Sequence, residues 1–219
     1  MKNSKQLLWL AFLTFCIMLT IPAQNQVTVD SLQNLANAAS LIEKPAALNQ
    51  LAEALISQSV AKAIQTATES VIVAEKNNNA NEQAHAYKIL SSCNILNGQI
   101  DEALNNSKKA IDIYLKIGKM KEVAETFNQL GLIYKQKRNF SKSSENFQKA
   151  IEYYTIVNDS SGIASTNGYL GSLSLIQNDY GNAIKYFQIS LQIRNRKHDF
   201  APRPPRKQSS GIPTQLIPL

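Results

Sequence analysis

Proline is absent from the whole stretch between Ala46 and Ala201, whereas five of the seven prolines of the chain follow within residues 202–219. Proline is the strongest helix breaker, because it has no amide N–H and its ring clashes with the preceding turn. The stretch without proline is rich in Ala, Leu, Lys, Gln and Ile, most of which favour helix. The sequence therefore predicts an all-α fold.

The body of the chain, residues 6–193, lacks a net charge. The formal net charge is +7, but residues 6–193 hold 15 basic and 15 acidic residues. The surplus comes from two lysines before residue 6 and from the segment after Ile193, where six basic residues accompany one acid. This distribution gives no support to a basic nucleic-acid-binding face across the fold.

Cysteine and histidine are equally scarce. The chain has only Cys16, Cys93, His85 and His198, and none of them lies at metal-ligand spacing from another. The sequence contains no glycine-rich phosphate loop, nucleophile elbow or kinase motif. We therefore expect no catalytic residue, no metal site and no cofactor, and we interpret Cys93 as a small buried side chain.

The first 23 residues have the pattern of a secretory signal. Two lysines precede an apolar run over residues 7–21, and Pro22 and Ala23 follow it. We predict cleavage after Ala23 and an exported protein, periplasmic or secreted. The alternative is an uncleaved membrane anchor, although the run is shorter than the roughly 20 residues of a spanning helix. A lipoprotein signal at Cys16 is disfavoured, because the bulky Phe15 stands where such signals resemble one another in having a small residue.

The sequence matches itself when it is shifted by 40 residues. Segments that begin at Ala84, Ala124 and Ala164 align without gaps, and a fainter copy precedes them with its first helix one residue out of step. Asn and Gly, which close helices in the left-handed conformation, recur with the same period. Apolar residues follow one another at helical three- and four-residue spacing. The equivalent positions include Leu90, Leu130 and Leu170, then Ser91, Gly131 and Gly171, then Ala110, Ala150 and Ser190.

This repeat predicts an α-solenoid of stacked antiparallel helix hairpins. Small residues such as Gly131 and Gly171 allow two helices to approach closely. No hairpin buries its own apolar face alone, so about three or more hairpins must stack. The expected organisation is a signal over 1–23, an N-terminal helix over 24–44, hairpins over about 45–78, 84–117, 124–157 and 164–197, and a tail over 198–219.

The second clear copy carries a family resemblance. It reads Phe127-x-x-Leu130-Gly131-x-x-Tyr134, with Phe140, Phe147 and Ala150 in its second helix. This pattern resembles the tetratricopeptide repeat (TPR) family and implies a TPR-like superhelix. The period of 40 exceeds the usual 34 of the family. Longer variants of this kind resemble the sensory regions of bacterial signalling proteins.

The resemblance implies a binding scaffold and not an enzyme. TPR proteins hold a protein or peptide along the inward side of the first helix of each repeat. Only Lys88 and Asn128 match the two-carboxylate clamp of the chaperone-binding members, so that ligand is not predicted. Carried over position by position, the predicted groove consists of His85, Lys88, Ser92, Glu125, Asn128, Leu132, Lys135, Ser165 and Ser172.

The segment 198–219 is polar, basic and rich in proline, and we expect it to be disordered. Pro204 and Pro205 stand where a further repeat should begin. The segment is either a functional linker or polyproline ligand, or the end of a truncated or frame-shifted copy of a longer signalling protein. Its positive charge suggests an alternative function, the binding of anionic surfaces such as nucleic acid or membrane.

The last predicted helix has an apolar stripe with no evident cover. Ile184, Phe187 and Leu191 follow one another at helical spacing near the end of the array. Exposed stripes of this kind promote association. A homodimer through this helix is therefore a further expected partner, beside the ligand of the groove.

Overall fold

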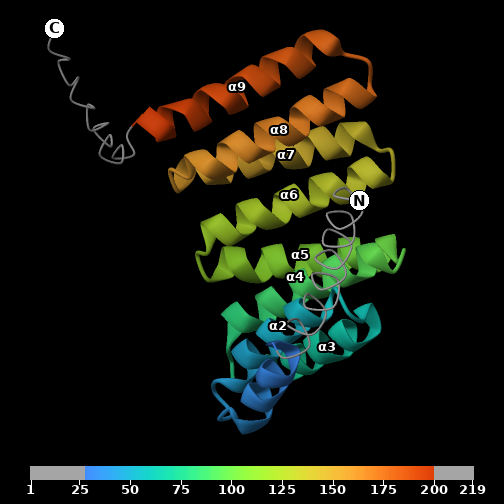
Figure 1. Ribbon diagram of the computed structural model, residues 1–219, viewed down its shortest axis with the longest axis vertical. Helices are drawn as coiled ribbons and strands as arrows, with labels where there is room; N and C mark the ends of the chain where they lie inside the picture. The colour runs from blue at the N-terminus through green and yellow to red at the C-terminus, as the bar shows by residue number, and fades with distance from the viewer. Residues whose placement is uncertain (1–27, 200–219) are drawn as a thin grey trace, which may run out of the picture.

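The described part of the chain is a stack of helices. The computed structural model describes residues 28–199, and all regular structure in this range is helical (Figure 1). This confirms the predicted all-α solenoid. Residues 28–38 form a helix that is followed by α2 Lys44–Leu55, α3 Val60–Lys76, α4 Ala80–Leu96, α5 Ile100–Lys116, α6 Met120–Gln136, α7 Phe140–Ile156, α8 Ser160–Ile176 and α9 Tyr180–Asp199.

From α3 onward a new helix begins every 20 residues. Helices α3 to α8 have 17 residues each, and three-residue turns separate them. The middle residue of each turn has a positive φ, and the residue after it donates its N–H to a carbonyl of the last helical turn. This arrangement is a Schellman motif, which closes the helix by a left-handed residue. The left-handed residues are Asn78, Gly98, Gly118, Arg138, Asn158 and Asn178.

The connection between α2 and α3 is different. It has four residues, Ile56 to Ser59, and none of them has a positive φ. Ser59 caps α3 by accepting a hydrogen bond from the N–H of Lys62. Nine residues separate Leu51 from Val60, against ten between the equivalent Leu90 and Ile100, so the first helix of the faint copy is one position out of step with the later repeats.

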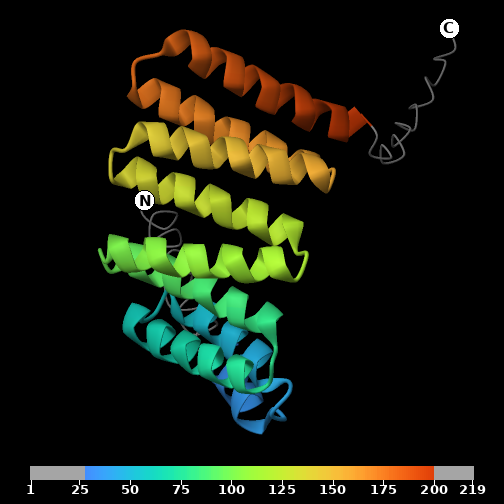
Figure 2. The same cartoon turned by 180° about the vertical axis from the view of Figure 1, so that it is seen from behind.

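Consecutive helices pair as antiparallel hairpins, and the hairpins stack along the long axis of the molecule (Figure 1, Figure 2). We call α2, α4, α6 and α8 the first helices and α3, α5, α7 and α9 the second helices of the four hairpins. Within the third hairpin, Gly131 of α6 lies against the ring of Phe147 of α7. Gly171 and Phe187 repeat this contact between α8 and α9.

The second hairpin replaces this glycine–phenylalanine contact by a pair of serines. Ser91 occupies the position of Gly131, and Ser107 occupies the position of Phe147. Their hydroxyl oxygens lie 2.7 Å apart, and Ser91 also donates to the carbonyl of Ala103 at 2.9 Å. Both serines are fully buried, and the hydrogen bonds satisfy their hydroxyls.

The core runs through the stack between successive hairpins. Cys93 is buried in it, as predicted, and burial raises the pKa of its thiol. Residues 1–27 and 200–219, which include the predicted signal and almost all of the predicted tail, lie outside the described residues. Within residues 28–199, no helix combines the length and the hydrophobicity that crossing a membrane requires.

Candidate partner-binding surface

Two of the three pairs of successive first helices approach each other more closely than successive second helices do. Helix α2 contacts α4 directly, and α6 contacts α8, whereas within residues 28–199 no second helix makes a comparable contact with the next second helix. A stack whose two layers differ in spacing curves toward the closer layer. The layer of first helices therefore forms the inner side, and polar side chains link these helices at three levels.

The first level joins α2 to α4. Nε2 of His85 lies 2.9 Å from Oε1 of Glu53, and Nδ1 of His85 lies 3.9 Å from Oε2 of Glu82. The side-chain amide of the buried Asn49 donates to Oε2 of Glu82 at 2.9 Å. The carboxylates of Glu53 and Glu82 raise the pKa of His85 to about 9, so its ring is protonated at neutral pH. In turn His85, together with the amide of Asn49, lowers the pKa of Glu82 to about 2.

The second level joins α4 to α6. Nζ of Lys88 lies 2.6 Å from Oε2 of Glu125, and both side chains are partly buried. One turn further along, Nε2 of Gln129 donates to Oγ of Ser92 at 2.7 Å. Two of the predicted groove residues on α4 are therefore held by side chains of α6.

The third level joins α6 to α8 inside the protein. Asn128 donates to Oγ1 of Thr166 at 2.9 Å, and Thr166 donates back to Oδ1 of Asn128 at 3.0 Å. Both residues are buried. A side chain that is buried and satisfied in this way positions its helix and is not available to a ligand.

The remaining predicted residues lie beyond these contacts on α6 and α8. Leu132 packs against the cluster around Phe147, and Ser172 donates to the carbonyl of Gly168 in its own helix. Lys135 and Ser165 are partly exposed, and their side chains make no ion pair or hydrogen bond within residues 28–199. These two side chains are free to meet a partner.

Sequence reasoning found both members of the contact between Lys88 and Glu125, but it missed one partner of the other contacts. Glu53, Glu82, Gln129 and Thr166 were not predicted, although each completes a pair with a predicted residue. The repeat did contain a signal for Glu82, since Glu122 occupies the equivalent position in the next copy. Family positions indicate where a ligand would lie. They do not reveal that the side chain at such a position already makes a hydrogen bond or ion pair with a neighbouring helix.

The second helices leave an open cleft on the other side of the stack. A cavity of about 270 Å³ lies between α5 and α7 with α6 at its floor. Nζ of Lys142 lies 5.5 Å from the ring centroid of Tyr134, and Nζ of Lys149 lies 5.8 Å from that of Phe127. These lysines cover the aromatic floor by cation–π contacts. No group of three or more potential metal ligands occurs within residues 28–199.

Helical hairpins in a single stack, a closely spaced inner layer and a core between repeats together define the class of TPR-like α-solenoids. Residues 26–196 match the family described as soluble NSF attachment protein (SNAP). The chain belongs to this family. A search of curated proteins finds no match.

Solved structures share the fold at low sequence identity. The chain is similar to BtubC (BKLC) from P. vanneervenii, with a TM-score of 0.59, 17% identity and coverage of 88% of this chain and 97% of that one. It is similar to a putative kinesin light chain with TPR-like repeats from Podosopora anserina, with a TM-score of 0.65, 15% identity and coverage of 81% and 90%.

A third relative is longer. The chain is similar to a Rap protein complexed with Competence and Sporulation Factor, with a TM-score of 0.71 and 12% identity. The match covers 81% of this chain and 51% of the Rap protein, so this chain spans about half of that structure. At these identities the likeness establishes the fold.

Proposed function

We propose that the protein binds a protein or peptide along the inner layer of first helices, at the end formed by α6 and α8. One observation carries this proposal. The inward polar side chains on α2 and α4 make ion pairs with neighbouring helices. In contrast, Lys135 on α6 and Ser165 on α8 are partly exposed and make no such contact within residues 28–199. The Rap structure named above, in complex with Competence and Sporulation Factor, supports a ligand of this kind for the fold.

The proposal narrows the predicted groove. His85, Lys88 and Asn128 hold the first helices together, so they set the shape of the surface. Lys135 is the cation of this surface that no acid neutralises within residues 28–199. A ligand with a carboxylate or another acidic group would therefore find its charge complement on α6.

Site-specific photo-crosslinking tests the position of the ligand. A photoreactive phenylalanine analogue is placed at Lys135 or Ser165, and a matched probe is placed at the exposed Gln148 on the second helix α7. In cells that express the full chain, we expect a discrete higher-mass adduct from the first two positions and none from Gln148. Adducts from Gln148 alone, or equal adducts from all positions, would contradict the proposal.

We further propose that the protein is exported and serves as the interaction part of a signalling protein. The signal pattern over residues 1–23 supports export, and the long TPR-like repeat supports the signalling role. Mass spectrometry of the natural protein should find Gln24 at its N-terminus. A chain that begins at Met1 and stays in the membrane fraction would favour the uncleaved anchor.

The alternative function of the basic tail stays a prediction. Binding to anionic surfaces through residues 198–219 requires that their deletion abolish salt-dependent binding to nucleic acid or vesicles and leave the helical fold intact. The homodimer through α9 likewise stays a prediction, and it would have to bring two basic helices together.

A further inference from the structure

The outer face of α9 differs from the equivalent faces of α5 and α7. The next hairpin covers those faces: Ile111 and Tyr114 of α5 pack with Val123 of α6, and Tyr154 of α7 lies against Gly162 of α8. On α9 the equivalent stripe is bare within residues 28–199. Its members are Tyr180, Ile184, Phe187 and Leu191, with 61%, 58%, 39% and 59% of their surfaces exposed.

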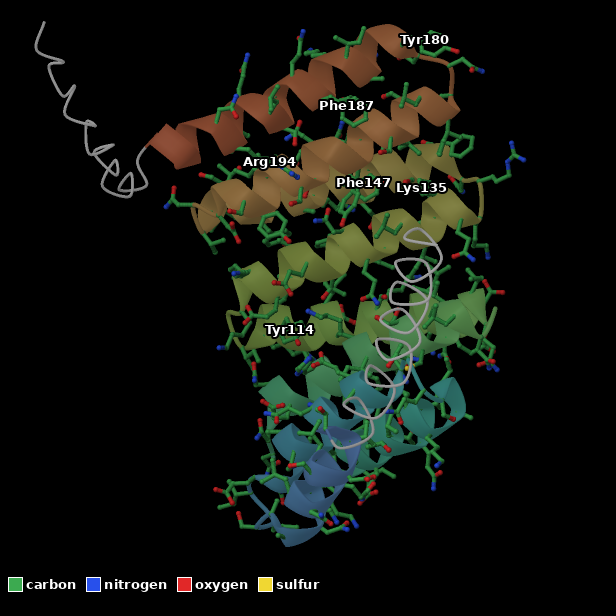
Figure 3. All side chains as sticks on the ribbon, in the orientation of Figure 1. Tyr114, Lys135, Phe147, Tyr180, Phe187 and Arg194 are labelled. Atoms are coloured by element: carbon green, nitrogen blue, oxygen red, sulfur yellow. The ribbon has the colours of Figure 1, made fainter. Side chains whose placement is uncertain are left out.

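These four residues form one continuous apolar surface. They follow one another at spacings of four, three and four residues, so they lie on one side of the helix. One flank of the Phe187 ring packs against Gly171, while the other flank is uncovered. Figure 3 shows Phe187 between Tyr180, at the start of α9, and Arg194 further along the helix.

Arg194 changes the chemistry of this surface. The equivalent residues in the earlier repeats, Tyr114 and Tyr154, are buried beneath a neighbouring helix, but Arg194 is exposed. Lys185 is exposed as well, and neither side chain makes an ion pair within residues 28–199. The sequence from Tyr180 to Lys197 contains four basic residues and no acidic residue.

We propose that the outer face of α9 binds an acidic amphipathic helix of another protein. The internal repeat gives the geometry: the partner helix lies on α9 as α6 lies on α5 and α8 on α7. The apolar stripe of the partner helix covers Ile184, Phe187 and Leu191. The partner also has an acidic residue at the position that is equivalent to Glu122 of α6 and Gly162 of α8. The carboxylate of this residue meets Arg194.

Charge decides between a foreign helix and a second copy of the chain. A dimer through α9 would bring two faces with the same basic surplus together, and repulsion between them would oppose association. An acidic helix gains from the same charges. This surface lies on the last second helix, apart from the inner layer of the proposed groove, so the two proposals can fail independently.

A synthetic peptide can serve as the probe. We choose the α6 sequence Met120–Gln136 with Lys121→Glu and Lys135→Glu, which has four acidic residues and no basic residue. Its counterpart carries Glu122→Lys and Glu125→Lys instead and reverses the charge. Binding of both labelled peptides to the full chain is followed by fluorescence anisotropy. We expect saturable binding of the acidic peptide, at least about ten times tighter than that of the basic one.

Variants of the protein locate the binding. Leu191→Glu should weaken the binding of the acidic peptide at least about tenfold. Leu96→Glu is the matched control, because Leu96 is 61% exposed and Leu191 is 59% exposed. This control should leave peptide binding unchanged. Arg194→Glu should remove the preference for the acidic peptide. Since these side chains are exposed, none of the changes should unfold the chain, which circular dichroism verifies.

Three outcomes overturn the proposal. The acidic peptide could fail to bind at any concentration up to about 1 mM, a limit that corresponds to negligible affinity. The Leu96→Glu control could weaken binding as much as Leu191→Glu. The wild-type chain could sediment as a dimer that Leu191→Glu dissociates, in which case a second copy occupies the face.

Discussion

Gly131 of α6 and Phe147 of α7 are a matched pair: a Cβ atom on Gly131 would lie 2.5 Å from two carbons of the Phe147 ring. Real Cβ atoms do not approach other carbons this closely, so the glycine gives the ring its place in the hairpin. Phe147 is completely buried and cannot move aside into solvent. The two residues therefore constrain each other.

The first prediction follows from this pair. Gly131→Ala should lower the free energy of unfolding by about 1–3 kcal/mol, because the methyl group overpacks a filled site. Gly168→Ala is the control in the neighbouring first helix. The nearest atom to its added Cβ is Oγ of Ser190 at 4.0 Å, so the change should be neutral or stabilise by up to about 1 kcal/mol. Thermal and urea unfolding measure both.

A double mutant tests whether the two positions act as a unit. In the presence of Phe147→Ser, the change Gly131→Ser should cost less than it does alone, because the serine pair imitates Ser91 and Ser107 of the second hairpin. Strictly additive effects would show that the glycine and the ring are independent.

The turn between α6 and α7 leads to a second prediction. Arg138 has a φ of 57°, a left-handed conformation that side chains with a Cβ tolerate poorly. Arg138→Gly should therefore raise the free energy of unfolding by about 1 kcal/mol. Lys137, the preceding residue, has an ordinary φ of −70°. Lys137→Gly should not stabilise, and stabilisation by both changes would point to charge as the cause.

Helix caps give a third prediction. Asn139 and Asp159 accept hydrogen bonds from the N–H groups of Lys142 and Gly162, whereas Lys119 occupies the equivalent turn position before α6 without a side-chain cap. Lys119→Asn should stabilise the chain by about 0.5–1 kcal/mol, and Asp159→Ala should destabilise it by about 1 kcal/mol. Melting temperatures that move together in one direction would contradict capping as the mechanism.

The fourth prediction concerns pH and His85. Its pKa is about 9 in the folded protein and about 6.5 when unfolded, so its stabilising effect is complete below pH 6.5 and is lost as the pH rises through 9. The free energy of unfolding of the wild type should exceed that of His85→Gln at pH 6 by about 1–2 kcal/mol, because the pair is partly screened. The difference should shrink steadily toward pH 10. A constant difference would mean that packing, and not charge, accounts for the effect.

The all-helical stack could be predicted from sequence because its causes are local. The absence of proline between residues 46 and 201, the left-handed Asn and Gly positions and the apolar spacing each fix a helix or a turn within a few residues. Arg138 also occupies a left-handed turn position, although arginine rarely adopts that conformation, and only the period of the repeat marked it.

The candidate site was less predictable because its contacts are distant in sequence. Lys88 meets Glu125 and Asn128 meets Thr166 across 37 and 38 residues, and no local pattern specifies that these side chains pair. The family resemblance pointed to the first helices. It could not distinguish Asn128, whose buried side chain is hydrogen-bonded to Thr166, from Lys135, whose side chain is partly exposed and makes no such contact within residues 28–199.

The unequal layers of the stack have a mechanical consequence. Along the inner layer, short polar contacts such as Lys88–Glu125 and Asn128–Thr166 join successive first helices, while an open cleft separates α5 from α7 on the other side. The stack is thus stiff along one edge and compliant along the other. We expect any change in its curvature to come from widening or narrowing the outer cleft, while the inner contacts stay intact.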